Sequence, residues 1–122
     1  KWTRFICRNA YFNDVQGLVG NEDAGQMSAW YILAASGLHP SCPGSTRIEV
    51  TSPVFSRIEF RLDGKYAKGK KFTVIAHGNS PEKIYVRKAL LNGRELKDMS
   101  IDYSDIMSGG ILELYMDSEH GL

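Results

Sequence analysis

The first 45 residues of the chain carry apolar side chains at helical spacing. One face of a first helix, which runs to about Phe12, would hold Trp2, Phe5, Ile6, Asn9 and Ala10. A second helix follows the turn-rich segment 13–20 and ends at Gly37 and Pro40. Its apolar stripe has the spacing i, i+3, i+4 and i+7 and consists of Met27, Trp30, Tyr31, Ala34 and Leu38. Two helices joined by a short loop predict an antiparallel helical hairpin.

After about residue 45 the apolar positions alternate with period two, which is the pattern of strands that bury one face. The alternating runs are 48–50, 57–62, 72–76, 84–86 and 112–116. Asn92 and Gly93 lie between two short runs and tolerate positive φ, so they predict a two-residue hairpin turn. Residues 103–110 predict a short helical turn that ends in glycines.

These patterns predict an α+β fold, with a helical hairpin over residues 1–45 and a small antiparallel β-sandwich over residues 46–122. We expect the sheet part to fold by itself more readily than the hairpin, because the apolar stripe of the hairpin needs more partners than the chain supplies. The chain begins without Met and without a signal peptide. Since a helical pattern is already under way at Lys1, we expect a start within a longer polypeptide.

Composition and charge exclude several classes of function. The chain is 43% hydrophobic and 24% charged, as globular proteins are, and no run approaches the roughly 20 apolar residues of a membrane span. The net charge is +1 with the signs interspersed, so we expect neither a nucleic-acid partner nor a membrane partner. Cys7 and Cys42 lack the clustered spacing of a zinc site, and the sequence leaves open whether they are bonded.

The densest chemical signal is the run G-N-E-D-A-G-Q-M-S-A-W-Y at residues 20–31, an acidic loop that opens into the second helix. Asp23 and Gln26 fit a capping box, in which the carboxylate accepts from free backbone N–H groups and the glutamine reaches back. The positive end of the helix also favours the ionised carboxylate. Such a side chain suits a general base, an electrostatic stabiliser or a cation ligand, and suits a general acid poorly.

The same residues have a purely structural interpretation. An Asp before a helix is usually a cap, and aromatic residues such as Trp30 and Tyr31 usually belong to the core, although rings of this kind also line sugar sites. However, Asn21, Glu22 and Asp23 place oxygen-bearing side chains in direct succession, which is more than a cap requires. The pattern alone leaves both interpretations open.

This run resembles the signature near the C-terminus of glycoside hydrolase family 92. The resemblance continues through residues 32–33, S-G-L-H-P at 36–40, and C-P-G at 42–44. It includes S-P-V-F at 52–55, N-S-P at 79–81, L-N-G at 91–93, and D-I-M-S-G-G at 105–110. The likeness therefore spans almost the whole chain, and its first motif is highly specific.

The resemblance implies a calcium-dependent, inverting, exo-acting α-mannosidase, in which an N-terminal β-sandwich and an (α/α)6 barrel enclose the site. Residues 1–45 would then be the end of the barrel. By the match, Asp23 takes the place of the general base, and Asn21 lies at a neighbouring position that is an aspartate in some members. Glu22 is a weaker candidate that would contact sugar hydroxyls or supporting groups. The resemblance places the general acid and most ligands of Ca2+ outside these residues.

We therefore predict a C-terminal fragment of a secreted or periplasmic α-mannosidase that acts on mannose-containing glycans such as N-glycans and is inactive without the upstream part of the polypeptide. The competing hypothesis is a stand-alone carbohydrate-binding or structural β-sandwich, in which the acidic loop is only a cap. A binding module would bind mannosides by itself, whereas a fragment would expose the apolar face of its helical hairpin.

Overall fold

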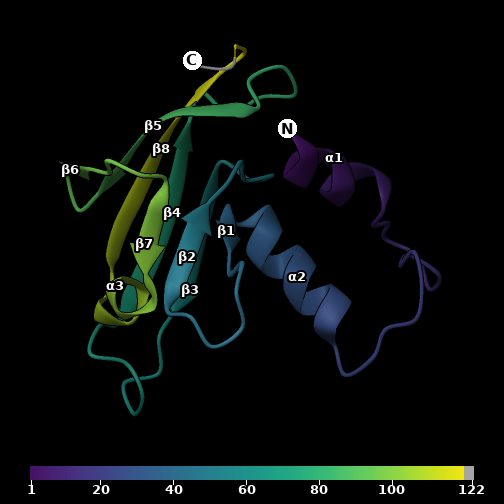
Figure 1. Ribbon diagram of the computed structural model, residues 1–122, viewed down its shortest axis with the longest axis horizontal. Coiled ribbons are helices and arrows are strands. Elements are labelled where there is room, and N and C mark those ends of the chain that lie inside the picture. Colours follow the sequence, from purple (N-terminus) through teal and green to yellow (C-terminus); the bar gives the residue numbers. More distant parts are fainter. Residues whose placement is uncertain (120–122) are drawn as a thin grey trace.

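The structure is a computed structural model that describes residues 1–119, and it places two helices beside two sheets (Figure 1). Helix α1 spans Trp2–Asn9 and helix α2 spans Gln26–Ala35. The two helices contact each other and lie on the same side of the strands (Figure 1). Two contacting helices therefore open the chain, as the apolar spacing predicts.

Helix α1 differs from the prediction in its end. It stops at Asn9 rather than near Phe12. The backbone N–H of Phe12 donates to the carbonyl of Gly17 at 2.9 Å, and Tyr11 forms an isolated bridge with Leu18. The amide of Ala10 still bonds back to the carbonyl of Ile6, but the chain then reverses, so the amide of Phe12 bonds across a turn instead of along a helix.

The face of α1 that packs on the described chain is not its apolar face. Trp2 and Phe5 are 67% and 55% exposed, whereas Arg4 and Cys7 are buried. The apolar stripe of α1 therefore points away from the described chain. Spacing identifies an apolar face without identifying what covers it, and the exposed apolar face agrees with the expectation for a fragment.

The strands form two sheets. A short helix, α3, spans Tyr103–Ser108 between the last two strands of the chain that the structure describes. The smaller sheet has the order β1-β2-β7, with β1 at Leu38–His39, β2 at Arg47–Val50 and β7 at Ser100–Asp102. The larger sheet has the order β3-β4-β8-β5-β6, with β3 at Arg57–Arg61, β4 at Lys71–His77, β8 at Gly110–Asp117, β5 at Tyr85–Leu91 and β6 at Arg94–Glu95. The predicted strands and the α+β class are thus confirmed.

The larger sheet is mixed because β4 and β8 pair in parallel, with Phe72 opposite Gly110 and His77 opposite Tyr115. The remaining pairs among the described strands are antiparallel. The hairpin at Asn92–Gly93 forms as predicted, with φ of 49° and 81° and Leu91 opposite Arg94. Alternation with period two identifies strands and their buried faces, but it does not identify the direction in which two strands pair.

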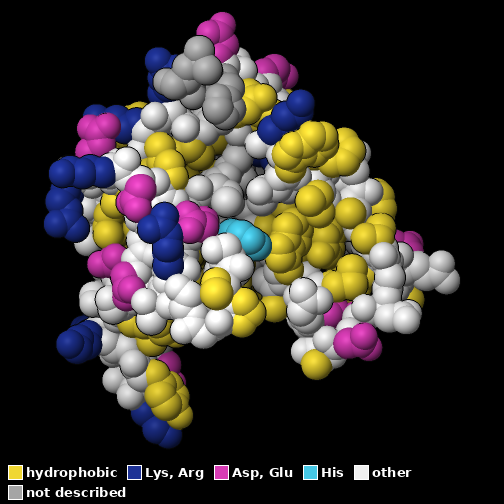
Figure 2. Space-filling model, viewed as in Figure 1, with side chains coloured by type: hydrophobic (Ala, Val, Ile, Leu, Met, Phe, Trp, Pro, Cys, Tyr) yellow, Lys and Arg dark blue, Asp and Glu magenta, His cyan; other side chains and the backbone are white. Residues whose placement is uncertain are grey.

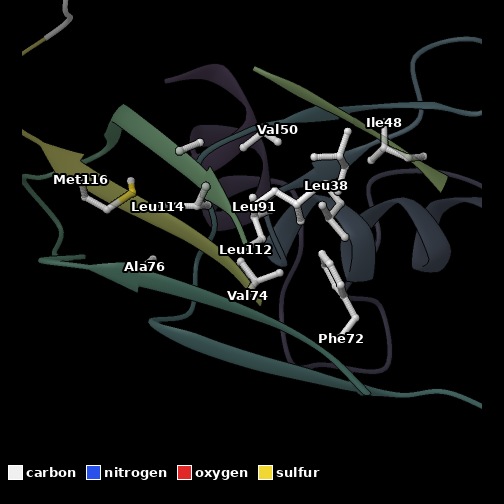
Figure 3. Close-up of a cluster of buried hydrophobic side chains, with 12 residues drawn as sticks. Leu38, Ile48, Val50, Phe72, Val74, Ala76, Leu91, Leu112, Leu114 and Met116 are labelled. Carbon is white, nitrogen blue, oxygen red and sulfur yellow. The ribbon is translucent and has the colours of Figure 1, made fainter. Parts of the chain in front are cut away.

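The hydrophobic core lies between the two sheets, which makes the strands a sandwich (Figure 3). The smaller sheet contributes Leu38, Ile48, Val50 and Ile101. The larger sheet contributes Phe72, Val74, Ala76, Ala89, Leu91, Leu112, Leu114 and Met116. Five of these residues have 0% exposure (Phe72, Val74, Ala89, Leu112 and Leu114), and burial of each of the four larger side chains is worth about 1.5–3 kcal/mol.

Arg4 connects helix α1 to the sandwich. Its guanidinium donates to the backbone carbonyls of Pro53 and Ser80 and to the side-chain oxygen of Asn79, 2.6 Å away. The amide of Asn79 in turn donates to the carbonyl of Val54 at 3.1 Å. These contacts tie the helices to the two segments that precede strands β3 and β5, and the helices carry the acidic loop.

Both cysteines are free, with Cys7 buried and Cys42 exposed. No helix within residues 1–119 is long and apolar enough to cross a bilayer. The predicted division at residue 45 stays a prediction, and residues 120–122 of its second part lie outside the described chain.

Candidate functional site

The acidic loop that leads into α2 turns through two successive left-handed residues. Ala24 has φ of 55° and Gly25, the N-cap of the helix, has φ of 78°. Gly25 adopts this conformation at no steric cost, whereas an alanine there costs about 1–2 kcal/mol. A strained alanine persists only where its surroundings hold it in place.

The surroundings that hold this turn centre on Glu22, not on Asp23. The two oxygens of Glu22 accept from the backbone N–H groups of Met27 at 2.8 Å and Ser28 at 2.9 Å, and from the Ser28 hydroxyl at 2.5 Å. The predicted capping box of Asp23 and Gln26 is therefore wrong. Because the left-handed turn makes Gly25 the N-cap, the carboxylate that reaches the free amides is the one before the turn.

These contacts also set the charge of Glu22. The hydroxyl of Ser28 first, and then the backbone N–H groups of Met27 and Ser28, hold the pKa of the Glu22 carboxyl below its usual value. Glu22 is thus an ionised cap with both oxygens occupied. Its contribution to stability is complete above the unfolded pKa and is lost as the pH falls through the lowered folded pKa.

Asp23, unlike Glu22, has a carboxylate without hydrogen-bond partners in the described chain. Its side chain is exposed, and among residues 1–119 no group forms a hydrogen bond or an ion pair with its carboxylate. The amides of the helix mouth already have acceptors, since Gln26 bonds to the Asp23 carbonyl at 3.3 Å and Ala29 to the Gly25 carbonyl at 2.9 Å. Asp23 is therefore a free carboxylate, open to solvent, beside a positively polarised helix end.

Asn21 completes the loop, with an exposed side chain that has no hydrogen-bond partner within the described residues. The structure thus keeps the three predicted site residues in one loop but separates their roles. Asn21 and Asp23 face solvent, whereas Glu22 turns back onto α2. An exposed carboxylate next to a free amide can accept a proton and orient a water molecule.

The aromatic residues that follow the loop pack against each other. Tyr11 stacks on Trp30 with 5.7 Å between ring centroids and lies 4.9 Å from the ring of Tyr31. The Tyr11 hydroxyl donates to the carbonyl of Met27 at 3.2 Å. Trp30 and Tyr31 also pack on the buried cluster around Cys7. These rings therefore brace the first turn of α2 from the side of α1.

A calcium site does not fit this loop by itself. Ca2+ takes about 6–8 oxygen ligands, and both oxygens of Glu22 are already engaged. Within residues 1–119 no group of three or more His, Cys, Asp or Glu side chains could hold a metal ion.

Comparison with known proteins decides the family. The sequence model described as the glycosyl hydrolase family 92 catalytic domain matches residues 1–118. The chain belongs to glycosyl hydrolase family 92. The resemblance carried by the acidic loop and the later motifs is thereby confirmed.

Solved structures of family 92 share the fold described above. A family GH92 inverting mannosidase from Bacteroides thetaiotaomicron is 37% identical, with a TM-score of 0.83, over 97% of this chain and 16% of that chain. A family GH92 α-mannosidase from the same organism is 33% identical, with a TM-score of 0.87, over 97% of this chain and 15% of that one.

An uncharacterized secreted glycosidase of Arthroderma benhamiae is 32% identical over 88% of this chain and 14% of its own length. The chain thus spans about one seventh of the length of this relative.

Ser28 and Tyr11 are the residues around the loop that sequence reasoning missed. The partner of Ser28 is Glu22, six residues earlier, and the contact forms only because the left-handed turn brings the two side chains together. Tyr11 lies in the turn-rich connection, where a helical or strand pattern gives no indication of its contacts. The sequence signal for the contact of Ser28 was Gly25, which lies between the acid Glu22 and the hydroxyl of Ser28.

Proposed function

We propose that this family 92 chain supplies the general-base loop of an inverting exo-α-mannosidase that acts on mannose-containing glycans. The longer protein would be the enzyme, and residues 20–25 would form one side of its active site. The relatives from Bacteroides thetaiotaomicron are described as mannosidases, and one of them as inverting, which supports this substrate and stereochemistry.

The single observation that carries the proposal is the free carboxylate of Asp23. Inversion needs one carboxylate that removes a proton from water and one protonated acid on the opposite side of the sugar, about 6.5–9.5 Å away. Glu22 suits the first role less well than Asp23, because both of its oxygens accept from Met27 and Ser28. Asp23 is exposed and unbonded within the described chain, so a water molecule can approach it.

In the proposed reaction, Asp23 accepts a proton from water as the water oxygen attacks the anomeric carbon. Asn21 orients that water through its side-chain amide. The bond to the leaving sugar breaks on the other face of the ring, where an acid from another part of the longer protein gives its proton to the departing oxygen. Both partners in this exchange are needed, so we propose that the chain is inactive alone.

The test is Asp23→Ala in the longer protein, assayed by release of mannose from an α-linked mannobiose. Loss of a general base should lower kcat about 10²–10⁴-fold, while the KM changes little. The anomer released first, followed by proton NMR, should be the β form in the unmodified enzyme.

Asp14→Asn is the matched control, because Asp14 is another exposed aspartate before α2, and its contact to the amide of Gln16 needs only a side-chain oxygen. Its kcat should equal that of the unmodified enzyme. Near-normal turnover by Asp23→Ala, or release of the α anomer, would contradict the proposal.

Calcium dependence and location belong to the same proposal. We propose that the enzyme depends on Ca2+ and that most of the Ca2+ ligands lie in other parts of the longer protein. Secretion or periplasmic export is supported by the name of the Arthroderma benhamiae relative, a secreted glycosidase. Degradation of N-glycans is the use that the family resemblance suggests.

A further inference from the structure

We propose that Glu22 is a positioning residue for the reaction, which keeps Asp23 out of the helix mouth by occupying that mouth itself. This inference rests on the proposed function, because it assigns to Glu22 a role that acts through Asp23. It differs from a sugar-binding role for Glu22, in which the carboxylate would itself contact the sugar.

Glu22 and Asp23 compete for the backbone amides at the start of α2. An α-helix leaves its first N–H groups without partners inside the helix, and a nearby carboxylate is their preferred acceptor. Two carboxylates precede α2 directly, Glu22 and Asp23, and the structure gives both available N–H groups to Glu22. If Glu22 were absent, Asp23 would be the nearest carboxylate to the amides of Met27 and Ser28.

The contacts of Glu22 with Met27 and Ser28 also constrain the backbone between these residues. Glu22 bonds to residues five and six positions later, so its side chain closes a loop over Asp23, Ala24 and Gly25. Ala24 holds a left-handed φ of 55° inside that loop. Closing the loop from outside keeps this turn in place, and the turn directs the side chain of Asp23 to solvent.

The hydroxyl of Ser28 makes a further contact with Glu22. It donates to the same Glu22 oxygen as its own backbone N–H, at 2.5 Å and 2.9 Å. A helix cap needs only the backbone donors, so the hydroxyl is an additional contact that fixes which rotamer Glu22 adopts. Glu22 and Ser28 therefore act as one unit behind Asp23.

The experiment is a double-mutant cycle in the longer protein, with Glu22→Ala, Asp23→Ala and the combined variant, assayed on α-linked mannobiose. Glu22→Ala should lower kcat by about 10²-fold, the loss typical of a misplaced reactive group, with the KM nearly unchanged. In the Asp23→Ala background the same substitution should have almost no further effect, because the group that it positions is gone.

Two further variants separate positioning from direct contact. Glu22→Gln keeps one side-chain oxygen for the amides of Met27 and Ser28, so it should retain clearly more activity than Glu22→Ala. Ser28→Ala removes the hydroxyl alone and should lower kcat about tenfold or less. Because Ser28→Ala leaves both backbone contacts, it also provides a folded test if Glu22→Ala fails to fold.

The matched control is Glu82→Ala. Glu82 accepts from the hydroxyl of Ser80 at 2.9 Å, so it forms a similar Glu–Ser pair far from the loop. Its removal should leave kcat unchanged.

The possible outcomes are distinguishable. A large loss for Asp23→Ala, combined with equal losses for Glu22→Ala in both backgrounds, overturns the positioning role and leaves the proposed function intact. A rise in KM without a change in kcat also overturns it, in favour of sugar contact by Glu22. Near-normal activity of Asp23→Ala overturns both, and the single variant alone reveals that case.

Discussion

At the residue scale, two adjacent carboxylates in this chain have different environments for a geometric reason. Glu22 lies before a left-handed turn and reaches back to the helix, whereas Asp23 lies inside the turn and faces solvent. The assignment follows from which carboxylate the amides of Met27 and Ser28 meet. One unusual backbone residue, Ala24, thus decides which of the two acids is available for chemistry.

Gly93 also has a left-handed backbone, and its replacement would measure the free-energy cost of that conformation for a residue with a side chain. Its φ is 81° and a Cβ added there would meet no atom within 4 Å, so Gly93→Ala changes conformation cost without changing packing. We expect the free energy of unfolding to fall by about 1–2 kcal/mol, measured by urea denaturation of the chain.

Gly64→Ala is the matched control for that measurement. A Cβ at Gly64 also has open space, but its φ lies outside the left-handed region. The free energy of unfolding should change by less than about 0.5 kcal/mol. Equal effects at the two glycines would show that strain is not the cause.

The roles of single residues were only partly predictable from the sequence. Asn92 and Gly93 were identified correctly because a turn of this type demands particular residues. The cap was assigned to Asp23 instead of Glu22, because sequence spacing assumes an ordinary backbone between cap and helix. A left-handed alanine is not visible in a sequence, since alanine is a regular helix former.

At the element scale, helix α1 is held to the sandwich by a polar contact. The buried guanidinium of Arg4 bonds to Pro53, Asn79 and Ser80, while the apolar side chains of α1 face outward. Periodicity predicted the helix but gave no indication that Arg4 is the residue that packs inward, because an arginine with three acceptors can be buried as completely as a leucine.

Arg4→Met should therefore loosen the helices more than the strands. The methionine keeps an apolar stem but leaves the carbonyls of Pro53 and Ser80 and the oxygen of Asn79 without their donor. We expect a loss of about 2–4 kcal/mol in the local stability of α1 and α2. Hydrogen exchange of the amides in Trp2–Asn9 and Gln26–Ala35, compared with those in β4 and β8, measures it.

Arg8→Met provides the control, because Arg8 is an exposed arginine of the same helix. It should leave the exchange rates of both helices unchanged. Uniform acceleration in helices and strands alike after Arg4→Met would mean that Arg4 stabilises the whole fold and not the junction.

At the scale of the whole molecule, polar and apolar surface are unevenly divided. Hydrophobic side chains gather over the region of α1 and α2, whereas charged side chains of both signs are spread over the strands (Figures 1 and 2). Exposed apolar residues of the helical part and its connecting loop include Trp2, Phe5, Ile6, Phe12, Val15, Val19 and Ile32. A surface of this kind marks an interaction site in a stable protein.

The isolated chain should therefore associate with itself and lack activity. We expect 1–122 to form dimers or larger species at micromolar concentration in analytical ultracentrifugation, with no release of mannose and no saturable binding of mannosides. The double variant Phe5→Ser with Ile32→Ser removes two exposed apolar side chains, 55% and 58% exposed, and should shift the chain toward monomer. A monomeric chain that binds mannosides would instead favour a carbohydrate-binding module.

The class and the order of the elements were predictable from the sequence, since helical spacing and period-two alternation are local. The parallel pairing of β4 with β8 was not, because it depends on which strand the chain inserts between two others. What covers the exposed apolar face of α1 was likewise not predictable, because local spacing identifies an apolar face and not its partner.

The position of β8 has a consequence for the order in which the protein matures during synthesis. This strand is the last one in the described sequence, yet it lies between β4 and β5 in the middle of the larger sheet. On the ribosome, both neighbours must wait without their inner partner until Gly110–Asp117 has emerged from the exit tunnel. The larger sheet can therefore be completed only after the helices and the acidic loop have already been made.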